Sequence, residues 1–300
     1  MMNDRSHLLT ELRLPESMNL DAMATEDAVA MMNAQDSIAV AAVGAEKMNI
    51  ARAIALIVTA FKAGGRLIYF GAGTSGRLGV LDASECPPTF RVEPEQVQGV
   101  IAGGEAAMFR AQEGVEDDAE AGAAAVDEKR MGPNDVAMGI AAGGTTPFVH
   151  GALKRAIARG AKTIFLSCVQ PVTDEPKVDV IIRPLTGPEV ITGSTRLKAG
   201  TATKLVLNML TTLAMVQMGK VHGNLMVDLR ATNQKLWDRG ARIVAKVTGL
   251  PHEKAMERLK AAGGHVKLAI VMVQRGVESS EGQICLDRAG GSLRIALETI

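Results

Sequence analysis

The chain has 300 residues, enough to bury a large core in one or two domains. Its 33 basic and 33 acidic residues balance and aromatic residues make up only 3%, so neither charge nor stacking favours nucleic acid or an anionic membrane as a partner. No apolar run approaches the roughly 18–20 residues of a membrane span, no signal peptide is evident, and three scattered cysteines form no disulfide scaffold. We therefore expect a soluble cytoplasmic protein.

The first part of the chain is predicted to be an N-terminal arm and helices. Residues 1–35 combine an extended polar arm with a short helix from Thr25. A longer helix is predicted from Asp36 or Ser37 to Lys62, ended by a pair of glycines.

Strands and helices then alternate. The predicted strands are near-continuous apolar runs, as expected when helices cover both faces of a sheet. They lie at 67–70, 97–102, 135–142, 163–168 and 178–183, with helices from about 75, at 105–122 and at 147–159. The pattern predicts an α/β domain over residues 36–222 with a doubly wound parallel sheet of about five strands, whose ligands bind at the carboxyl ends of the strands.

The last third of the chain is predicted to be helical. A helix over 195–220 is apolar nearly all round after Lys204, which is typical of a helix buried under a sheet or in a subunit interface and favours a homodimer. Residues 223–300 are expected to form a small helical module, with helices at 224–247, 251–262, 264–275 and 279–297.

The first strand leads into a glycine-rich segment, Gly71-Ala-Gly-Thr-Ser-Gly76, which we call the first loop. Glycines let the backbone turn sharply and approach a ligand, and a helix N-terminus with free N–H groups is suited to a phosphate. Gly73, Thr74 and Ser75 are therefore candidate phosphate-binding residues.

The first loop also satisfies the G-x-G-x-x-G pattern of dinucleotide-binding proteins. That function needs an acidic residue about 20 positions on, at the end of the second strand. Here Glu93 and Glu95 precede the second strand, and the adjacent Thr-Ser pair suits a terminal phosphomonoester better than a pyrophosphate. We favour a phosphomonoester over a nicotinamide cofactor.

Two further segments carry hydroxyl groups at the same predicted sheet edge. The second loop, residues 142–147, contains Gly144, Thr145 and Thr146 before a proline in the first turn of a helix. The third loop, residues 192–198, contributes Ser194 and a cation at the start of the long helix. The alternative is that each is an ordinary turn, but together they indicate a shared anion site.

Two carboxylates are candidate catalytic groups. Glu85 lies in D-A-S-E-C-P-P, where the prolines are expected to halt the chain just after a helix, and Glu116 lies in E-G-V-E-D on the helix after the second strand. Each has the ordinary alternative of a surface charge, whereas a pair beside a phosphate site can act as acid and base. The histidines show no metal-ligand spacing, and Cys86 has no histidine near it in sequence, so a metal site or a thiol nucleophile is not expected.

Most of the chain resembles one family of the sugar isomerase (SIS) superfamily. The segments 65–90, 101–105, 113–117, 192–210 and 219–236 are similar to N-acetylmuramic acid 6-phosphate etherases, and the D-A-S-E-C-P-P block is the most specific of them. The resemblance implies cleavage of the D-lactyl ether of N-acetylmuramate 6-phosphate in cell-wall recycling, with Glu85 and Glu116 as the catalytic pair and no metal or organic cofactor. The expected partner is a small amino sugar phosphate, with no nucleic acid and no membrane.

The resemblance also implies a mechanism. The open-chain aldehyde acidifies the C2 proton, which Glu116 removes, and the lactyl oxygen leaves C3 with Glu85 as the acid, after which water adds to the double bond. One departure concerns the second loop, where the family has A-S-G-R-T-P and this chain has Gly143 and Thr145 in place of the serine and arginine. We expect weaker phosphate binding there.

Three other functions remain open on this fold. The chain could be a sugar-phosphate-binding regulator in which the glutamates are inactive, similar to glucokinase regulatory protein. It could be an aldose–ketose isomerase, which shares the C2 proton chemistry, or a glycosidase, which also uses two carboxylates.

Overall fold

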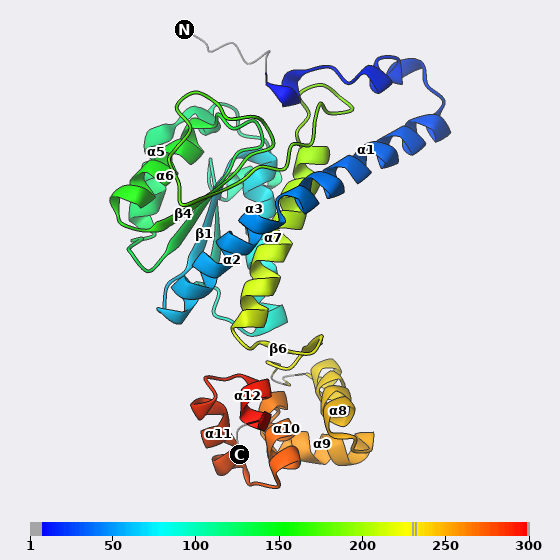
Figure 1. Cartoon of the computed structure of the whole chain (residues 1–300), viewed down its shortest axis with the longest axis vertical. Coiled ribbons are helices and arrows are strands. Elements are labelled where there is room, and N and C mark those ends of the chain that lie inside the picture. Colours follow the sequence, from blue (N-terminus) through cyan, green and yellow to red (C-terminus); the bar gives the residue numbers. More distant parts are fainter. Residues whose placement is uncertain (1–7, 230, 232, 299–300) are drawn as a thin grey trace. The chain divides into compact units, whose positions relative to one another are not determined.

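The structure is a computed structural model, and it describes residues 8–229, 231 and 233–298 (Figure 1). The chain divides into two compact units, one of Met1–Ser84 with Pro94–Thr211 and one of Glu85–Glu93 with Thr212–Ile300. The sequence-based domain bounds of 1–35, 36–222 and 223–300 stay a proposal.

The described N-terminal arm begins with three short 3₁₀ turns, η1 (Leu9–Glu11), η2 (Pro15–Ser17) and η3 (Leu20–Ala22). Two helices follow, α1 (Thr25–Ala45) and α2 (Lys47–Lys62). The prediction of a break near residue 36 was wrong, because the helices meet at Glu46, whose carboxylate accepts a hydrogen bond of 2.8 Å from the Asn49 side chain.

The first unit contains the predicted five-stranded sheet. Its strands are β1 (Leu67–Gly71), β2 (Val97–Ile101), β3 (Val136–Ile140), β4 (Lys162–Leu166) and β5 (Val180–Ile182). They run parallel in the order β2-β1-β3-β4-β5. The fold class is confirmed, and each strand lies within about two residues of its predicted bounds.

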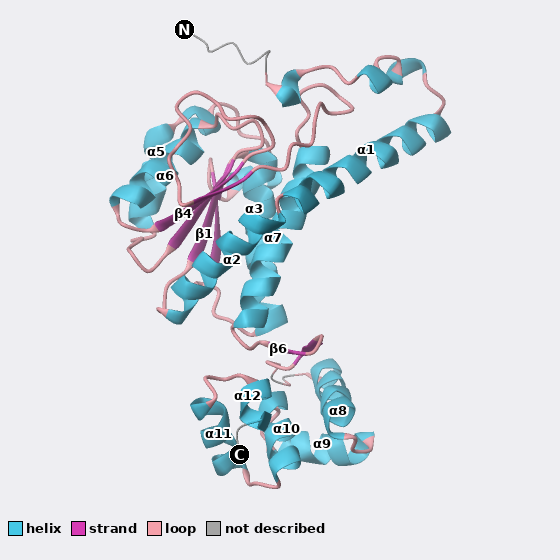
Figure 2. Cartoon of the chain, in the orientation of Figure 1, coloured by secondary structure: helices cyan, strands magenta, loops and turns pink. Residues whose placement is uncertain are grey.

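Helices cover both faces of the sheet (Figure 2). On one face α6 (Pro147–Ala158) packs on the sheet, where its Val149 and Leu153 share one buried cluster with Ile68 and Phe70 of β1, and α5 (Ala119–Glu128) lies alongside α6. On the other face lie α2 and α3 (Gly73–Phe90). A Cβ at Gly79 of α3 would lie 2.9 Å from the Cβ of Tyr69, so the helix needs a glycine to approach the sheet this closely.

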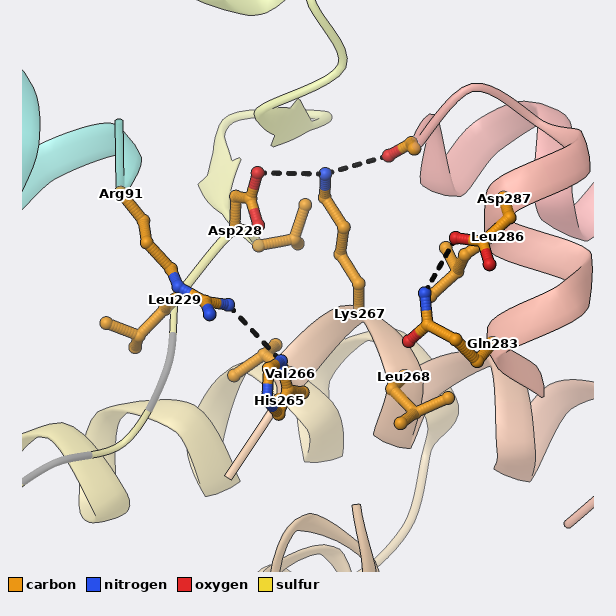
Figure 3. A pocket seen from close by; sticks show the side chains of 12 residues that line it. Arg91, Asp228, Leu229, His265, Val266, Lys267, Leu268, Gln283, Leu286 and Asp287 are labelled. Atoms are coloured by element: carbon orange, nitrogen blue, oxygen red, sulfur yellow. Dashed lines mark hydrogen bonds and ion pairs between the residues drawn. The ribbon is translucent and has the colours of Figure 1, made fainter. Parts of the chain in front are cut away.

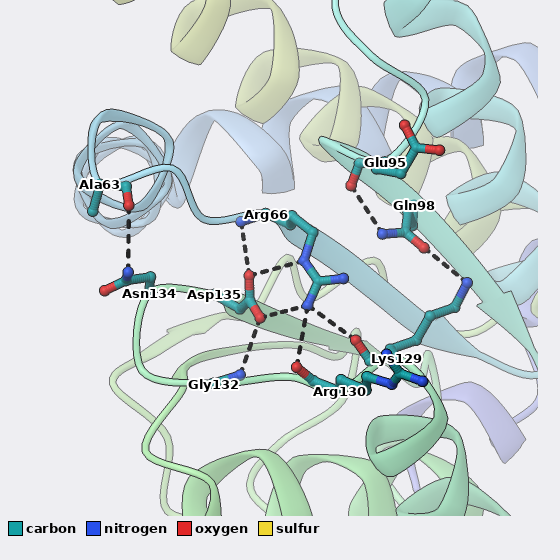
Figure 4. Close-up of polar contacts among 9 residues, drawn as sticks. All are labelled: Ala63, Arg66, Glu95, Gln98, Lys129, Arg130, Gly132, Asn134 and Asp135. Carbon is teal, nitrogen blue, oxygen red and sulfur yellow. Dashed lines mark hydrogen bonds and ion pairs between the residues drawn. The ribbon is translucent and has the colours of Figure 1, made fainter.

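The amino ends of the strands, away from the expected ligand edge, are joined by a salt bridge (Figure 4). The Arg66 guanidinium lies 2.8 Å from the Asp135 carboxylate and also donates to the carbonyl oxygen of Lys129 at 3.0 Å. Asp135 in turn accepts from the backbone N–H groups of Arg66 and Gly132. The cluster fastens the start of β1 to the start of β3.

Two predicted helices differ in the structure. Helix α3 continues through Pro87 and Pro88, so the expectation that these prolines halt the chain was wrong. Proline fits helical φ and here removes hydrogen bonds only near the end of the helix. The predicted helix over 105–122 is instead α4 (Ala106–Phe109), the 3₁₀ turn η4 (Val115–Asp117) and α5, because Gly114 has a φ of 76° and the Asp118 side chain caps α5.

The described residues of the second unit comprise the ends of α3 and α7 (Lys198–Gln217), a hairpin and five further helices. Strands β6 (Val221–His222) and β7 (Leu225–Met226) pair antiparallel, and β7 lies within the helix predicted over 224–247, so that prediction was wrong there. The helices are α8 (Gln234–Thr248), α9 (His252–Ala261), α10 (Val266–Arg275), α11 (Ser279–Arg288) and α12 (Leu293–Glu298). Helix α8 begins later than predicted because the Asn233 side chain accepts the N–H of Leu236 and so caps the helix there.

Within the part of the chain that the structure describes, two helices are long and apolar enough to pass a length-and-composition test for a membrane span, α1 and α7 (Lys198–Gln217). The most apolar window of α7 is 56% buried within the protein, as in a core helix, against 17% for α1. Exposed apolar side chains on α1 include Val29, Ile38 and Val40.

Candidate active site

The first loop is a tight turn that requires glycine at both ends. A Cβ at Gly71 would lie 2.7 Å from the backbone nitrogen of Gly76, and a Cβ at Gly76 would lie 2.6 Å from Ile101. The turn therefore brings the N-terminus of α3 directly over the end of β1. Thr74 and Ser75 occupy the first turn of that helix and are half-buried.

The second loop lies beside the first because β1 and β3 are neighbours in register, with Gly71 opposite Ile140. Gly144 has a φ of 75°, and its carbonyl oxygen is 2.8 Å from the His150 ring. Thr146 is the N-cap of α6, yet its side chain makes no capping hydrogen bond. Its hydroxyl is therefore not used by the helix.

The third loop meets the first at the start of α7. A Cβ at Gly200 would lie 3.6 Å from the Thr74 methyl group and 3.5 Å from the Thr195 carbonyl oxygen. The buried Glu189 carboxylate already accepts the N–H groups of Lys198 and Ala199, both at 2.9 Å. This helix end is thus occupied by a carboxylate of the chain itself.

The side chain of Lys198 is buried in the same region. Its ammonium donates to the Gln35 side chain at 2.6 Å. Burial lowers the pKa of Lys198, and the nearby Glu189 carboxylate acts in the opposite direction. The cation expected from the third loop is therefore not presented by Lys198. Ser194 remains half-buried nearby, with its N–H bonded to the Ile191 carbonyl oxygen.

A pocket of about 180 Å³ opens next to the first loop. Gly73 lines one part of it and Glu116, from the turn η4, lines another. The full lining is Ala72, Gly73, Arg77, Ala102, Ala107, Ala111, Gln112, Glu113, Gly114, Val115 and Glu116. Glu116 is exposed and lies in a 3₁₀ turn rather than on the helix that the sequence predicted.

Arg77 is a pocket residue that the sequence analysis did not single out. Its guanidinium donates to the carbonyl oxygens of Ala107 at 2.7 Å and Met108 at 3.0 Å, so it fixes the short helix α4 against α3. It places a positive charge in the wall that also contains Glu116. The signal available in the sequence was its position directly after the first loop.

Glu85 does not lie just after a helix at a rigid corner. It is an exposed residue within α3, and it belongs with the second unit. The pocket in the first unit therefore contains one of the two predicted glutamates.

The N-terminal arm contributes to the same edge of the sheet. Thr10 is fully buried, and its carbonyl oxygen accepts the N–H of Gly193 at 3.1 Å. The Thr10 hydroxyl has no hydrogen-bond partner among the described residues, and it lies 3.9 Å from where a Cβ on Gly143 would be. The arm thus packs against the second and third loops.

Comparisons with known proteins define the class first. Residues 49–157 match the model of the glucokinase regulatory protein N-terminal SIS domain, and residues 223–266 match the model of the C-terminal lid domain of glucokinase regulatory protein. With its parallel sheet and hydroxyl-bearing loops, the chain is a protein of the SIS class.

Curated relatives define the family. The chain is 52% identical to an N-acetylmuramic acid 6-phosphate etherase of Synechocystis over 99% of this chain and 98% of the relative. It is 52% identical to the Nostoc punctiforme etherase (99% and 96% covered) and 51% identical to that of Gloeobacter violaceus (99% and 97%). The chain belongs to the N-acetylmuramic acid 6-phosphate etherase family.

Solved structures are more distant. A protein of E. coli CFT073, solved as a complex, aligns with a TM-score of 0.48 and 14% identity, over 67% of this chain and 97% of the other. The Vibrio vulnificus NanR protein complexed with ManNAc-6P aligns with a TM-score of 0.43 and 15% identity, over 65% and 67%. At these TM-scores the family assignment depends on the etherase relatives alone.

Proposed function

We propose that this chain cleaves the D-lactyl ether of N-acetylmuramate 6-phosphate to give N-acetylglucosamine 6-phosphate and D-lactate. The observation that carries the proposal is the identity of about 50% with etherases over nearly the whole chain, with both glutamates and all three loops inside the aligned length. The position of the first loop beside a pocket that is lined by the Glu116 carboxylate supports the proposed activity independently.

The phosphate binds at the first and second loops. Thr74, Ser75 and Thr146 donate their hydroxyls, supported by backbone N–H groups at the start of α3 and α6. A phosphomonoester carries nearly two negative charges at neutral pH, so this contact anchors the substrate far from the reacting carbons. Gly73, Gly144 and Thr145 shape the two loops around it, and Ser194 is a weaker contact.

The reaction is an elimination followed by addition of water. Glu116 removes the C2 proton of the open-chain sugar, the electron pair forms the C2–C3 double bond, and the C3–O bond to the lactyl group breaks. Glu85 protonates the departing oxygen, releasing D-lactate. Water then adds hydroxide to C3 and a proton to C2, which restores the sugar. The position of Glu116 in the pocket beside Gly73 and Arg77 supports its role as the base.

The protein acts as a cytoplasmic homodimer in this proposal. Support comes from α1, whose buried residues are limited to Gln35, Ala39 and Val43, while Val29, Ile38 and Val40 face solvent in the single chain. Apolar side chains along one long helix are covered favourably by a second copy of the chain.

Lactate release tests the proposal. Purified protein is incubated with N-acetylmuramate 6-phosphate, and D-lactate is measured with a coupled dehydrogenase. The chain should release lactate, Glu116→Gln should release almost none, and Glu113→Gln, which changes a second carboxylate in the same pocket, should be nearly unaffected. Binding of the sugar phosphate without lactate release would support a regulator, and formation of a ketose would support an isomerase.

A further inference from the structure

The second unit contains a pocket that the proposed reaction does not use (Figure 3). It has a volume of about 280 Å³ and lies between the end of α3, the segment after β7, the start of α10, and α11. Its lining is Arg91, Val227, Asp228, Leu229, His265, Val266, Lys267, Leu268, Gln283, Leu286, Asp287 and Gly291. All of these residues belong to the one unit.

The pocket has an apolar floor and a charged wall. Val227 and Val266 are fully buried and Leu268 and Leu286 nearly so, as members of the hydrophobic core of the unit. The floor is therefore part of the packed core of the unit. The polar groups converge above it from four separate segments of the chain (Figure 3).

Two cations, Arg91 and Lys267, and two carboxylates, Asp228 and Asp287, line the pocket, and Lys220 lies behind this wall. The ammonium groups of Lys220 and Lys267 both lie against one Asp228 oxygen, at 2.7 Å and 3.2 Å, so a single carboxylate serves two cations. Lys267 also donates to the Gly291 carbonyl oxygen at 2.8 Å. Burial lowers the pKa of Lys267, Asp228 raises it, and the nearby charges of Lys220 and Arg91 lower it further.

Arg91, the second cation of the lining, contacts a histidine. Its guanidinium lies 3.2 Å from Nδ1 of His265, and the side chain is exposed. Its backbone is left-handed, with a φ of 52°, at the position after a helix where glycine is usual. The second pocket carboxylate, Asp287, accepts a hydrogen bond of 2.8 Å from Gln283.

We propose that this pocket binds a small phosphomonoester anion, with the Arg91 guanidinium and the Lys267 ammonium as its cationic contacts. A guanidinium presents paired donors that match phosphate oxygens, and an ammonium supplies a point charge. The apolar floor takes the neutral part of the molecule. Free phosphate and a sugar phosphate share this chemistry, and the volume accommodates either.

The single tryptophan of the chain allows the pocket to be observed directly. Trp237 packs against the core of the second unit. Its ring lies 3.3 Å from where a Cβ on Gly264 would be, and Gly264 directly precedes the pocket residue His265 in the sequence. Its fluorescence is measured in the full-length protein at constant ionic strength during titration with inorganic phosphate, N-acetylglucosamine 6-phosphate, D-lactate and unphosphorylated N-acetylglucosamine. The two phosphates should give a saturable change, and the other two should not.

Charge variants on exposed positions decide where the anion binds. Arg91→Gln should weaken binding by about tenfold, the usual effect of losing one charge-assisted contact. Asp287→Asn should tighten it roughly two- to fivefold by removing a repelling charge. Arg288→Gln is the control for loss of a cation, because Arg288 is an exposed arginine of α11 beside Asp287 that does not line the pocket, and this variant should leave the affinity unchanged.

A variant of the first loop serves as the second control. The fluorescence titration should be the same in Ser75→Ala, whose effect is limited to the first unit. The proposal is overturned by the absence of a saturable phosphate signal, by equal affinity in Arg91→Gln and Arg288→Gln, or by loss of the signal in Ser75→Ala, which would trace it to the first loop. Saturation by D-lactate with no response to phosphate would also overturn it.

Discussion

The Asp82 carboxylate accepts a hydrogen bond of 2.9 Å from the Tyr69 hydroxyl, which joins α3 to the central strand β1 inside the core of the first unit. The same carboxylate accepts from Asn208 at 2.8 Å and Thr211 at 3.3 Å, both on α7. One buried acidic group thus holds a strand and two helices together, three residues before Glu85 in sequence.

Replacing Asp82 with alanine should destabilise the first unit. The change leaves three buried or half-buried donors without this acceptor, which costs about 1–3 kcal/mol. Burial raises the pKa of Asp82, and the hydrogen bonds from Asn208, Tyr69 and Thr211 oppose this effect only in part. Because the pKa of Asp82 is raised in the folded protein, its contribution to the free energy of unfolding is fully present below the ordinary pKa of 3.8. That contribution declines as the pH rises through the raised pKa.

Urea unfolding of wild type and Asp82→Ala from pH 4 to pH 7 measures this effect. The free energy lost in the variant should be largest at the acidic end of the range. Tyr69→Phe, which removes one donor and keeps the carboxylate, should keep a pH dependence of the same sign and extend it to higher pH, because the Tyr69 hydrogen bond lowers the pKa of Asp82. A difference between wild type and Asp82→Ala that grows toward pH 7 would contradict this account.

Arg66→Met should destabilise the amino edge of the sheet. Burial raises the pKa of Asp135, but the hydrogen bonds from Arg66 and from the Gly132 N–H outweigh it and leave the pKa below its ordinary value. Because the folded pKa is lowered, the stabilisation is present above pH 3.8 and is lost as pH falls further through the lowered value. Losing the guanidinium leaves Asp135 nearly buried without its cation, which costs about 2 kcal/mol at pH 7.

The control is Arg159→Met, which removes a cation from the half-exposed pair with Asp127. Thermal unfolding at pH 7 should show a clear drop in Tm for Arg66→Met and little change for Arg159→Met. Equal effects of the two variants would mean that burial of the Arg66 pair is unimportant.

The apolar runs predicted the sheet well because helices cover both of its faces, so the burial of the central strands β1 and β3 appears directly in the sequence. The hairpin of Val221–His222 with Leu225–Met226 was missed because each strand has only two residues and no alternating pattern to read. The continuation of α3 past Pro87 was missed because proline rules describe an isolated helix, and near a helix end the cost is small enough for packing to override it.

The candidate site was predictable in part for a related reason. Glycine turns such as Gly71 to Gly76 are local, and their geometry follows from residues close in sequence. Thr10 contacts the third loop from a segment far away in the sequence, and Arg77 holds the short helix α4. Neither contact follows from a periodic pattern in the sequence, so neither was predicted. Glu116 was considered as an acid or base from the sequence, but its run of charges is equally typical of a solvated surface, and the family resemblance favoured the catalytic role.

Ser75→Ala should impair phosphate binding in the first loop. A hydrogen bond to a phosphate is made in the ground state and kept in the transition state, so KM should rise by roughly tenfold with a smaller change in kcat. Steady-state lactate release gives both constants, with Thr74→Ala measured alongside. An unchanged KM in both variants would remove the first loop from the site.

Gly143→Ser combined with Thr145→Arg should tighten KM, because these are the family residues that this chain lacks. Space permits the serine, since the nearest described atom to a Cβ at Gly143 is the Thr10 hydroxyl oxygen at 3.9 Å. The new hydroxyl would also give that buried oxygen a partner, so Tm should not fall. Gly143→Ala is the control for bulk without a hydroxyl. Weaker binding in the double variant would show that the second loop holds the phosphate in a different way.

The roles of the two glutamates can be separated because an elimination through a carbanion divides C2 proton removal from lactate departure. Glu116→Gln keeps its size but cannot accept a proton, so both lactate release and exchange of the C2 hydrogen with D₂O should collapse. Glu85→Gln removes the acid that assists a poor leaving group, which lowers lactate release by about 10²–10⁴-fold. Its C2 hydrogen should still exchange, because Glu116 is intact, and proton NMR in D₂O follows that exchange directly. Exchange that survives in Glu116→Gln and disappears in Glu85→Gln would assign the base to Glu85 and the acid to Glu116.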